Sequence, residues 1–318
     1  MTGPYNHRPV GYLLVILSAL AYSSLGIFGK IGLEADLPLA SFLAARFALA
    51  ATALWTVVLI VPRLRQALAA AARARAGLLL WGMVGLAGQS ALYFAGLRTL
   101  SASLMEVLLY TCPAFLALIE WGRTGVRPKR RVVAALLFAL FGTWLAAAPA
   151  FGGSTLTGVI LGLLTGLWYA SFLVPLDRLT KGIEPVVATT CIVSGAAVTW
   201  LAAALWSGVR IPATETLWWS LGGIVLFPTI LGFALFVAGM RRTGPQVASI
   251  LSTFEPVGTL LLAAAFLGER LLPRQWAGAG LVVAAAILLA LGPDRLPLTR
   301  RRGAPGHVGA EVSPSVPH

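Results

Sequence analysis

The chain has 318 residues, of which 58% are hydrophobic and only 11% are charged, and its formal net charge is +13. Soluble domains contain about 45–50% apolar and about 25% charged residues, so this composition predicts an integral membrane protein and excludes a soluble domain. The basic residues lie in short segments between apolar runs and not across one surface. This distribution argues against nucleic acid as a partner.

Residues for metal or cofactor chemistry are scarce. The three histidines, His7, His307 and His318, lie near the ends of the chain, so we expect no His-based metal site or catalytic triad. Cys112 and Cys191 lie within apolar stretches, and we expect both to be free, buried thiols. No GxxxxGK[ST] phosphate loop is present, so ATP hydrolysis is not encoded. The sequence therefore predicts no metal, no cofactor and no ATP-driven step.

Apolar stretches long enough to cross a bilayer follow one another along the chain. A membrane helix needs about 20 apolar residues, whereas a barrel strand has about ten that alternate with polar ones. The continuous runs therefore predict an all-α integral membrane protein with ten transmembrane helices. Their approximate ranges are 10–31, 38–61, 77–97, 101–121, 132–149, 156–176, 186–207, 216–239, 246–267 and 274–292.

The loops between these stretches predict an orientation. With the N-terminus inside, the inner segments hold 18 of the 24 Lys and Arg residues, which is the asymmetry expected of cytoplasmic loops. Residues 1–9 and 293–318 are therefore expected in the cytoplasm of a multi-pass protein of the plasma (inner) membrane. The segment 293–318 is rich in Pro, Gly, Ser and Arg and is expected to be disordered, with its basic run near anionic lipid.

The two halves of the chain repeat each other. Residues 11–24 read GYLLVILSALAYSS, and 147 positions later residues 158–171 read GVILGLLTGLWYAS. A second match, at a spacing of 143, aligns Leu92, Gly96 and Pro113 with Leu235, Gly239 and Pro256. We predict five-helix repeats at 10–149 and 156–292, joined by an external linker at 150–155. Because five is odd, the second repeat must be inverted relative to the first, as in many secondary transporters.

Several motifs resemble those of the EamA family of the drug/metabolite transporter superfamily. They are Ala44-Ala45-Arg46-Phe47 in the second stretch, and Ser252-Thr253-Phe254-Glu255-Pro256 leading to Leu267-Gly268-Glu269-Arg270. In the first repeat, Cys112-Pro113 stands where Glu-Pro would match. The resemblance implies transport of amino acids, other small metabolites or drugs, commonly as export. It also implies a path surrounded by helices 1–4 and 6–9, with helices 5 and 10 peripheral.

Arg46 and Glu106 are charged residues inside predicted spans. They lie about eight and about five residues from the outer ends of the second and fourth stretches, or about 12 and about 8 Å deep. A charge at the bilayer centre costs about 2.5–3.5 kcal/mol, so such residues normally face a cavity or a partner. The two side chains are close enough in depth to pair. The pair would serve as a gate or substrate contact, or only join two helices.

Glu255 lies near the middle of the ninth stretch, directly before Pro256. Pro256 cannot donate to the carbonyl of Ser252, and Pro113 likewise frees the carbonyl of Leu109, so both prolines are predicted helix breaks with polar groups at equivalent depths. A desolvated carboxylate at this position could take up a proton. The alternative is that Glu255 caps a neighbouring helix and the prolines only bend the bundle.

Polar side chains near the middle of the membrane complete the candidate substrate pathway. They are Tyr22 and Ser24 in the first stretch, Tyr169 and Ser171 at the matching places in the sixth, and Gln89 and Tyr93, which share a helix face in the third. Such groups often only bond a neighbouring helix, at about 0.6 kcal/mol on average. Because the Tyr and Ser pairs are symmetric between the two halves, a role in lining a cavity is as well supported as bonding to a neighbouring helix.

These observations favour a secondary transporter, not an enzyme, that exports a small metabolite such as an amino acid or a drug-like compound by alternating access, with proton coupling through Glu255 as a candidate mechanism. The alternatives are an importer or facilitator of the same fold, and a membrane-embedded enzyme acting on a lipid-linked substrate. The enzyme would need a nucleophile–base pair or metal ligands near an interface. The expected partners are a small-molecule substrate and membrane lipid. The sequence is also compatible with a homodimer.

Overall fold

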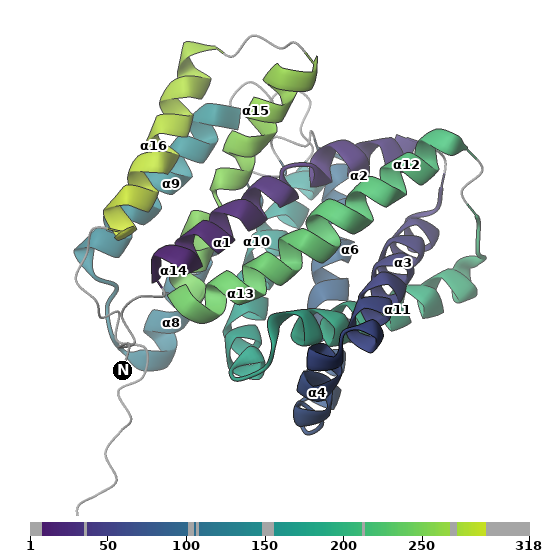
Figure 1. Cartoon of the computed structure of the whole chain (residues 1–318). Helices are drawn as coiled ribbons and strands as arrows, with labels where there is room; N and C mark the ends of the chain where they lie inside the picture. The colour runs from purple at the N-terminus through teal and green to yellow at the C-terminus, as the bar shows by residue number, and fades with distance from the viewer. Residues whose placement is uncertain are drawn as a thin grey trace, which may run out of the picture.

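The computed structural model describes residues 8–34, 37–100, 105, 108–147, 156–211, 214–267 and 272–290, and these ranges contain helices and no strand. Most of the segment 1–9, the linker 150–155, the tail 293–318 and Glu106 lie outside them. The helices, labelled as in Figure 1, are α1 (Arg8–Tyr22), α2 (Leu25–Glu34), α3 (Leu39–Ile60), α4 (Pro62–Ala70), α5 (Arg75–Trp81), η1 (Gly82–Leu86), α6 (Ala87–Leu97), α8 (Cys112–Thr124), α9 (Arg130–Ala147), α10 (Leu156–Thr180), α11 (Pro185–Ser207), α12 (Glu215–Ile224), η2 (Val225–Gly232), α13 (Phe233–Thr243), α14 (Pro245–Leu251), α15 (Phe254–Leu267) and α16 (Pro273–Ala290).

Within the described residues, six helical segments are long and apolar enough to cross a membrane. They are Pro9–Gly29, Leu39–Ile60, Arg75–Leu97, Leu156–Thr180, Pro185–Ser207 and Glu215–Thr243. Two of them, α5–η1–α6 and α12–η2–α13, contain a π-helical turn in the middle. The other four stretches predicted from the sequence contain α8, α9, α14 with α15, and α16, which are shorter or interrupted in the described ranges.

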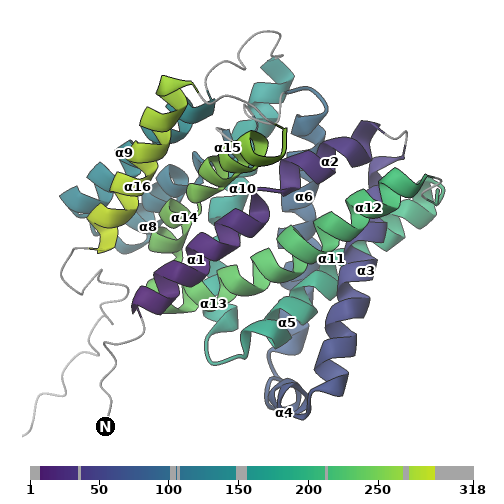
Figure 2. The ribbon, with the colours of Figure 1, turned by 45° about the horizontal axis from the view of Figure 1, so that its top comes forward.

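The helices of the two halves pair across the molecule. α9 packs along α16 at one side of the bundle, as Figures 1 and 2 both show, and α3 packs along α11. α1 lies against α13, and α10 lies against α6. The contacts of α1 with α13 and of α10 with α6 correspond, because each joins the first predicted span of one half to the third predicted span of the other. These four contacts are therefore retained when the two halves are exchanged.

The π-helical segments lie at matching positions, since η1 begins at Gly82 and η2 at Val225, 143 residues later. A π turn departs from the regular i→i−4 ladder, so its carbonyl oxygens can need other donors in an apolar interior. In η1, Met83 O accepts from Thr199 Oγ1 and Gly85 O accepts from Trp168 Nε1, both at 2.9 Å. These bonds join η1 to α11 and α10.

Close contact between η1 and α11 depends on two glycines. A Cβ atom at Gly82 would lie 2.0 Å from the carbonyl oxygen of Ile192, and one at Gly195 would lie 2.0 Å from that of Leu79. Side chains larger than hydrogen therefore do not fit at either position. Trp55 Nε1 also donates to Ser194 Oγ at 2.9 Å and joins α3 to the same helix, α11.

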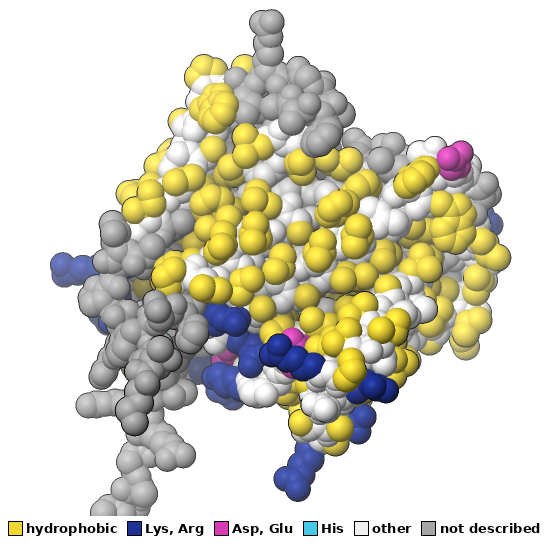
Figure 3. All heavy atoms as spheres, viewed as in Figure 1, with side chains coloured by type: hydrophobic (Ala, Val, Ile, Leu, Met, Phe, Trp, Pro, Cys, Tyr) yellow, Lys and Arg dark blue, Asp and Glu magenta, His cyan; other side chains and the backbone are white. Residues whose placement is uncertain are grey.

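The outer surface of the bundle is apolar. Leu59, Leu205, Trp206 and Trp219 are among many large hydrophobic side chains that are exposed. Figure 3 shows hydrophobic side chains over the middle of one face, with Lys and Arg gathered at its lower edge. An extensive exposed apolar surface marks a site of contact with membrane or protein, and its position around spanning helices identifies the protein as a membrane protein.

The glycine contact predicts a position-specific effect of one methyl group. Gly195→Ala should lower the thermal unfolding midpoint of the purified protein, because overpacking a close contact costs about 1–3 kcal/mol. Gly222→Ala in α12 is the matched control, since beyond its chain neighbours and its own helix backbone no atom lies within 4 Å of the Cβ it would add. Equal unfolding midpoints for the two variants would contradict the close approach of η1 and α11.

Candidate functional site

A central cavity of about 80 Å³ lies where the interrupted helices meet. Among the side chains that line it are six predicted for the pathway, namely Tyr22, Arg46, Gln89, Tyr93, Tyr169 and Glu255. Phe94, Phe172 and Phe233 provide apolar walls. Water occupies about 30 Å³ per molecule in the liquid, and drug-sized ligands occupy pockets of about 300–1,000 Å³. The cavity must therefore widen to admit a metabolite.

Arg46 of α3 is 5% exposed, and protein groups surround its guanidinium. Its Nε donates to Thr229 Oγ1 at 2.8 Å. The guanidinium carbon lies 4.9 Å from the ring centroid of Phe47 and 5.8 Å from that of Phe94, distances at which ring faces attract a cation. The predicted partner Glu106 lies outside the described residues, so the Arg46–Glu106 pair stays a prediction.

A proline in η2 explains why Thr229 is in position to hold Arg46. Pro228 has no N–H, so the carbonyl of Ile224 lacks the donor that an α-helix would supply from position 228. Thr229 Oγ1 donates to this carbonyl at 2.6 Å, and the same oxygen accepts from Arg46. The local break in η2 is thereby linked to the buried cation of α3.

Glu255 of α15 is 6% exposed and is held at both its side chain and its backbone. Its Oε2 accepts a hydrogen bond from the hydroxyl of Tyr110, which precedes α8. Its carbonyl oxygen accepts from Ser23 Oγ at 2.9 Å, at the break between α1 and α2, and from Thr259 Oγ1 at 3.1 Å. Glu255 therefore connects three segments that are far apart in the sequence.

Both predicted helix-breaking prolines follow an interruption of the helix. α8 begins at Cys112 before Pro113, and α15 begins at Phe254 before Pro256. The expectation that Pro256 leaves the carbonyl of Ser252 free is wrong. This carbonyl accepts from Glu255 N at 2.9 Å, because the chain tightens into a turn with i→i+3 bonding before the proline.

Ser24 and Ser171, which were predicted beside Tyr22 and Tyr169, do not line the cavity. Ser24 Oγ donates to Ala21 O, and the exposed Ser171 donates to Leu167 O, both at 2.9 Å. Residues two apart on a helix do not share a face, so a serine two positions after a cavity tyrosine points elsewhere. Ser171 bonds to its own helix, and Ser24, in the turn after α1, bonds to the last turn of that helix.

Three polar side chains that were not among the predicted pathway residues also line the cavity: Ser90, Tyr110 and Ser252. Tyr110 had a sequence signal, because it lies one helical turn before the repeated proline, as Thr253 does in the second half. Gln89 was predicted, but its state was not. Its Oε1 is buried without a hydrogen-bond partner in the described part of the chain, and so can accept from a ligand.

The link between Thr229 and Arg46 predicts an effect on stability. Thr229→Val keeps the shape of the side chain but leaves the Ile224 carbonyl and the Arg46 Nε without this partner, which should cost about 1–3 kcal/mol of unfolding free energy. Thr229→Ser should retain most of the stability. The control Thr52→Val alters an exposed threonine that bonds only its own helix and should change stability by at most about 0.5 kcal/mol. If Thr229→Val unfolds at the same denaturant concentration as Thr52→Val, Thr229 does not hold Arg46 as described.

Comparison with known proteins gives a consistent result. A family model described as the EamA-like transporter family matches the chain twice, at residues 9–148 and 156–291. The uncharacterized transporter YwfM of Bacillus subtilis is 26% identical over 210 residues, which cover 64% of this chain and 70% of that protein. The uncharacterized transporter YcbK of the same organism is 26% identical over 59% of this chain and 63% of its own length. The uncharacterized inner membrane transporter YicL of Salmonella typhimurium is 25% identical over 69% and 74%.

A solved crystal structure also shares the architecture. It superposes with a TM-score of 0.71, covering 89% of this chain and 97% of its own, at 18% sequence identity. At this identity the likeness concerns the fold alone.

Proposed function

Because the chain belongs to the EamA-like transporter family, we propose that it is a secondary transporter that exports a small metabolite through the central cavity. The observation that carries the proposal is the burial of Arg46 and Glu255 around one cavity inside a membrane bundle. Charged groups at this depth cost about 2.5–3.5 kcal/mol each on insertion scales and usually mark a pathway for ions or substrate.

The proposed topology has ten spans, with both termini in the cytoplasm of the plasma (inner) membrane and two inverted repeats at 10–149 and 156–292. The double family match supports a duplication, as do the equivalent positions of η1 and η2 and the reciprocal helix contacts. Alternating access would then come from rocking one half against the other around the cavity. The small cavity volume is consistent with a closed state between the two open ones.

The cavity chemistry suits a small polar or amphipathic compound such as an amino acid or a drug-like molecule. Arg46 can bind an acidic group, Glu255 a basic group or a proton, and the tyrosines can donate or accept hydrogen bonds. The phenyl walls of Phe94, Phe172 and Phe233 favour an apolar part of the same molecule. Without an ATP-binding loop, an ion gradient or the substrate gradient supplies the energy.

Metabolites released by cells that overproduce the protein test export. A few compounds should accumulate in the medium several-fold with the wild type and not with Glu255→Gln, which removes the charge at nearly constant volume. Glu215→Gln is the matched control, because Glu215 is exposed at the start of α12 and should leave release unchanged.

The other outcomes separate the alternatives. No accumulated compound, or equal accumulation with Glu255→Gln, would contradict export through this cavity. Depletion of a compound from the medium would favour an importer. A changed lipid composition without any solute movement would favour the membrane-embedded enzyme.

Proton coupling through Glu255 predicts a response to a pH gradient. In right-side-out vesicles loaded with the exported compound, acidifying the outside should speed its release, because each pH unit adds about 1.4 kcal/mol of driving force for each proton exchanged. Glu255→Gln should lose this acceleration, because the amide cannot carry a proton. Release that is indifferent to the gradient in the wild type would rule out proton exchange.

A further inference from the structure

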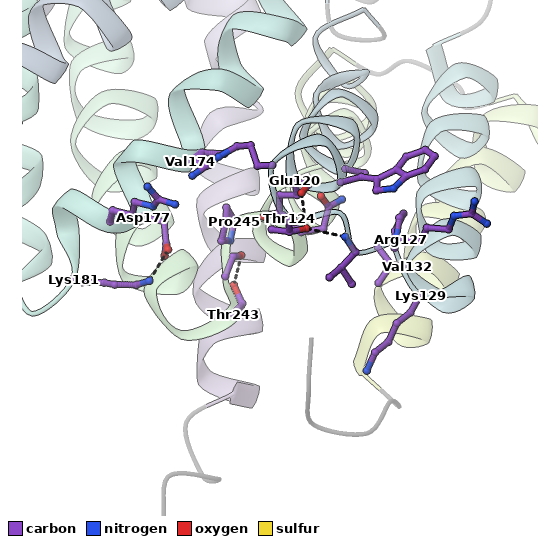
Figure 4. Close-up of a pocket in the computed structure, with 18 residues that line it drawn as sticks. Glu120, Thr124, Arg127, Lys129, Val132, Val174, Asp177, Lys181, Thr243 and Pro245 are labelled. Atoms are coloured by element: carbon purple, nitrogen blue, oxygen red, sulfur yellow. Dashed lines mark hydrogen bonds and ion pairs between the residues drawn. The ribbon is translucent and has the colours of Figure 1, made fainter. Parts of the chain in front are cut away.

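A second cavity, of about 200 Å³, lies where α8, α10, the end of α13 and the start of α14 meet (Figure 4). We call it the basic-end cavity. In the proposed topology it faces the cytoplasm. None of the residues predicted for the substrate pathway lines it. It is separate from the central cavity and larger.

Three buried or half-buried side chains that carry oxygen atoms line this cavity. Asp177 of α10 is 8% exposed, and its Oδ2 lies 3.0 Å from Lys181 Nζ, the ion pair drawn in Figure 4. Glu120 of α8 is half-buried. Gln246 of α14 is 6% exposed and donates from Nε2 to Pro113 O at 3.1 Å.

The oxygen of Gln246 gives an independent indication of a ligand. Gln246 Oε1 is buried without a hydrogen-bond partner in the described ranges. Buried amide oxygens nearly always accept a hydrogen bond, so an unpaired one beside a cavity marks a place for an external donor. Carboxylates and an amide oxygen together accept from a donor with several N–H groups, as an ammonium has.

The rim of the same cavity has the opposite charge. Its basic side chains are exposed and outnumber the two carboxylates: Arg123, Arg127, Lys129, Arg178 and Lys181. A simple amine would be repelled by this net positive lining, whereas a simple anion would leave Gln246 Oε1 without a donor. A molecule with an ammonium at one end and an acidic group at the other satisfies both regions. The volume of about 200 Å³ suits a small organic molecule and exceeds the need of a single ion.

We propose that the basic-end cavity binds a small zwitterion, with its ammonium at Glu120, Asp177 and Gln246 and its acidic group at Arg123 and Arg178. An amino acid and the phosphoethanolamine headgroup of a lipid share this chemistry. The proposal goes beyond export, because binding here requires no passage through the central cavity.

Thermal stabilisation of the purified full-length protein tests the proposal. The standard amino acids and phosphoethanolamine are compared with amines and acids that lack one of the two groups. At least one zwitterion should raise the unfolding midpoint, and its matched amine and acid should not. Glu120→Gln should weaken binding about tenfold, since it removes a charge-assisted hydrogen bond. Arg178→Ala should weaken binding by a similar factor, and it should not destabilise the fold because Arg178 is exposed.

Two further variants locate the binding. Glu215→Gln is the charge-matched control and should bind normally. In Arg46→Ala, which removes the cation of the central cavity, zwitterion binding should persist even if export is lost. Loss of binding in Arg46→Ala but not in Glu120→Gln would place the ligand in the central cavity and overturn the proposal. Equal stabilisation by the simple amine or acid, or none by any zwitterion or lipid, would also overturn it.

Lipid nanodiscs separate the two sources of the ligand. Phosphatidylethanolamine and phosphatidylcholine carry the same charges, but the quaternary ammonium of phosphatidylcholine has no N–H to donate. If the headgroup is the ligand, phosphatidylethanolamine should stabilise the wild type more than phosphatidylcholine does, and Glu120→Gln should remove the difference. If a free zwitterion is the ligand, added amino acid should stabilise the protein equally in both discs.

Discussion

The hydrogen bond from Arg46 to Thr229 is the interaction on which the central site depends. A cation inside an apolar bundle is tolerated only where protein groups or a ligand replace water. Thr229 supplies one such group because Pro228 frees the carbonyl that orients its hydroxyl, and the faces of Phe47 and Phe94 supply others. The π-helical segment is therefore part of the site, and the same sequence spacing places its counterpart η1 against α10 and α11. Near this cation, hydrogen bonds of Glu255 connect three helix breaks: the turn at Ser23, the segment at Tyr110 before α8, and the start of α15.

Much of the fold could be predicted because membrane helices correspond to long apolar runs in the sequence, with Pro or Gly at their ends. The predicted stretches 38–61 and 186–207 agree closely with α3 and α11. The short helix α4, which carries two arginines and a glutamine in nine residues, was not predicted, and neither were the π turns, which depend on donors from other helices. For the site, membrane depth and repeat symmetry were enough to predict that Tyr22, Tyr169, Arg46 and Glu255 belong to one site. The same criteria wrongly placed Ser24 and Ser171 in the site, because a uniformly apolar helix has no hydrophobic pattern that shows which face points inward. The position of Tyr110 before the repeated proline was a sequence signal, but its role follows from its contact with Glu255, 145 residues away.

One segment, residues 110–113, contacts residues of both cavities. Tyr110 lines the central cavity and bonds Glu255, and three residues later the carbonyl of Pro113 accepts from Gln246 of the basic-end cavity. The equivalent break in the second half, before Pro256, carries Ser252 and Glu255 themselves. The proposed duplication accounts for two similar helix breaks, and they differ in chemistry because Cys112 stands at the position that matches Glu255.

Solute flux through the purified protein tests the central claim most directly. Proteoliposomes are loaded with the small-molecule extract of cells, and mass spectrometry follows which compounds leave, so no substrate has to be assumed. The account predicts that wild-type vesicles lose a few compounds faster than protein-free vesicles. Vesicles with Arg46→Ala, shown to be folded by their unfolding midpoint, should lose none of these. Equal loss from wild-type and Arg46→Ala vesicles, or no loss beyond the protein-free rate, would contradict transport through the cavity around Arg46.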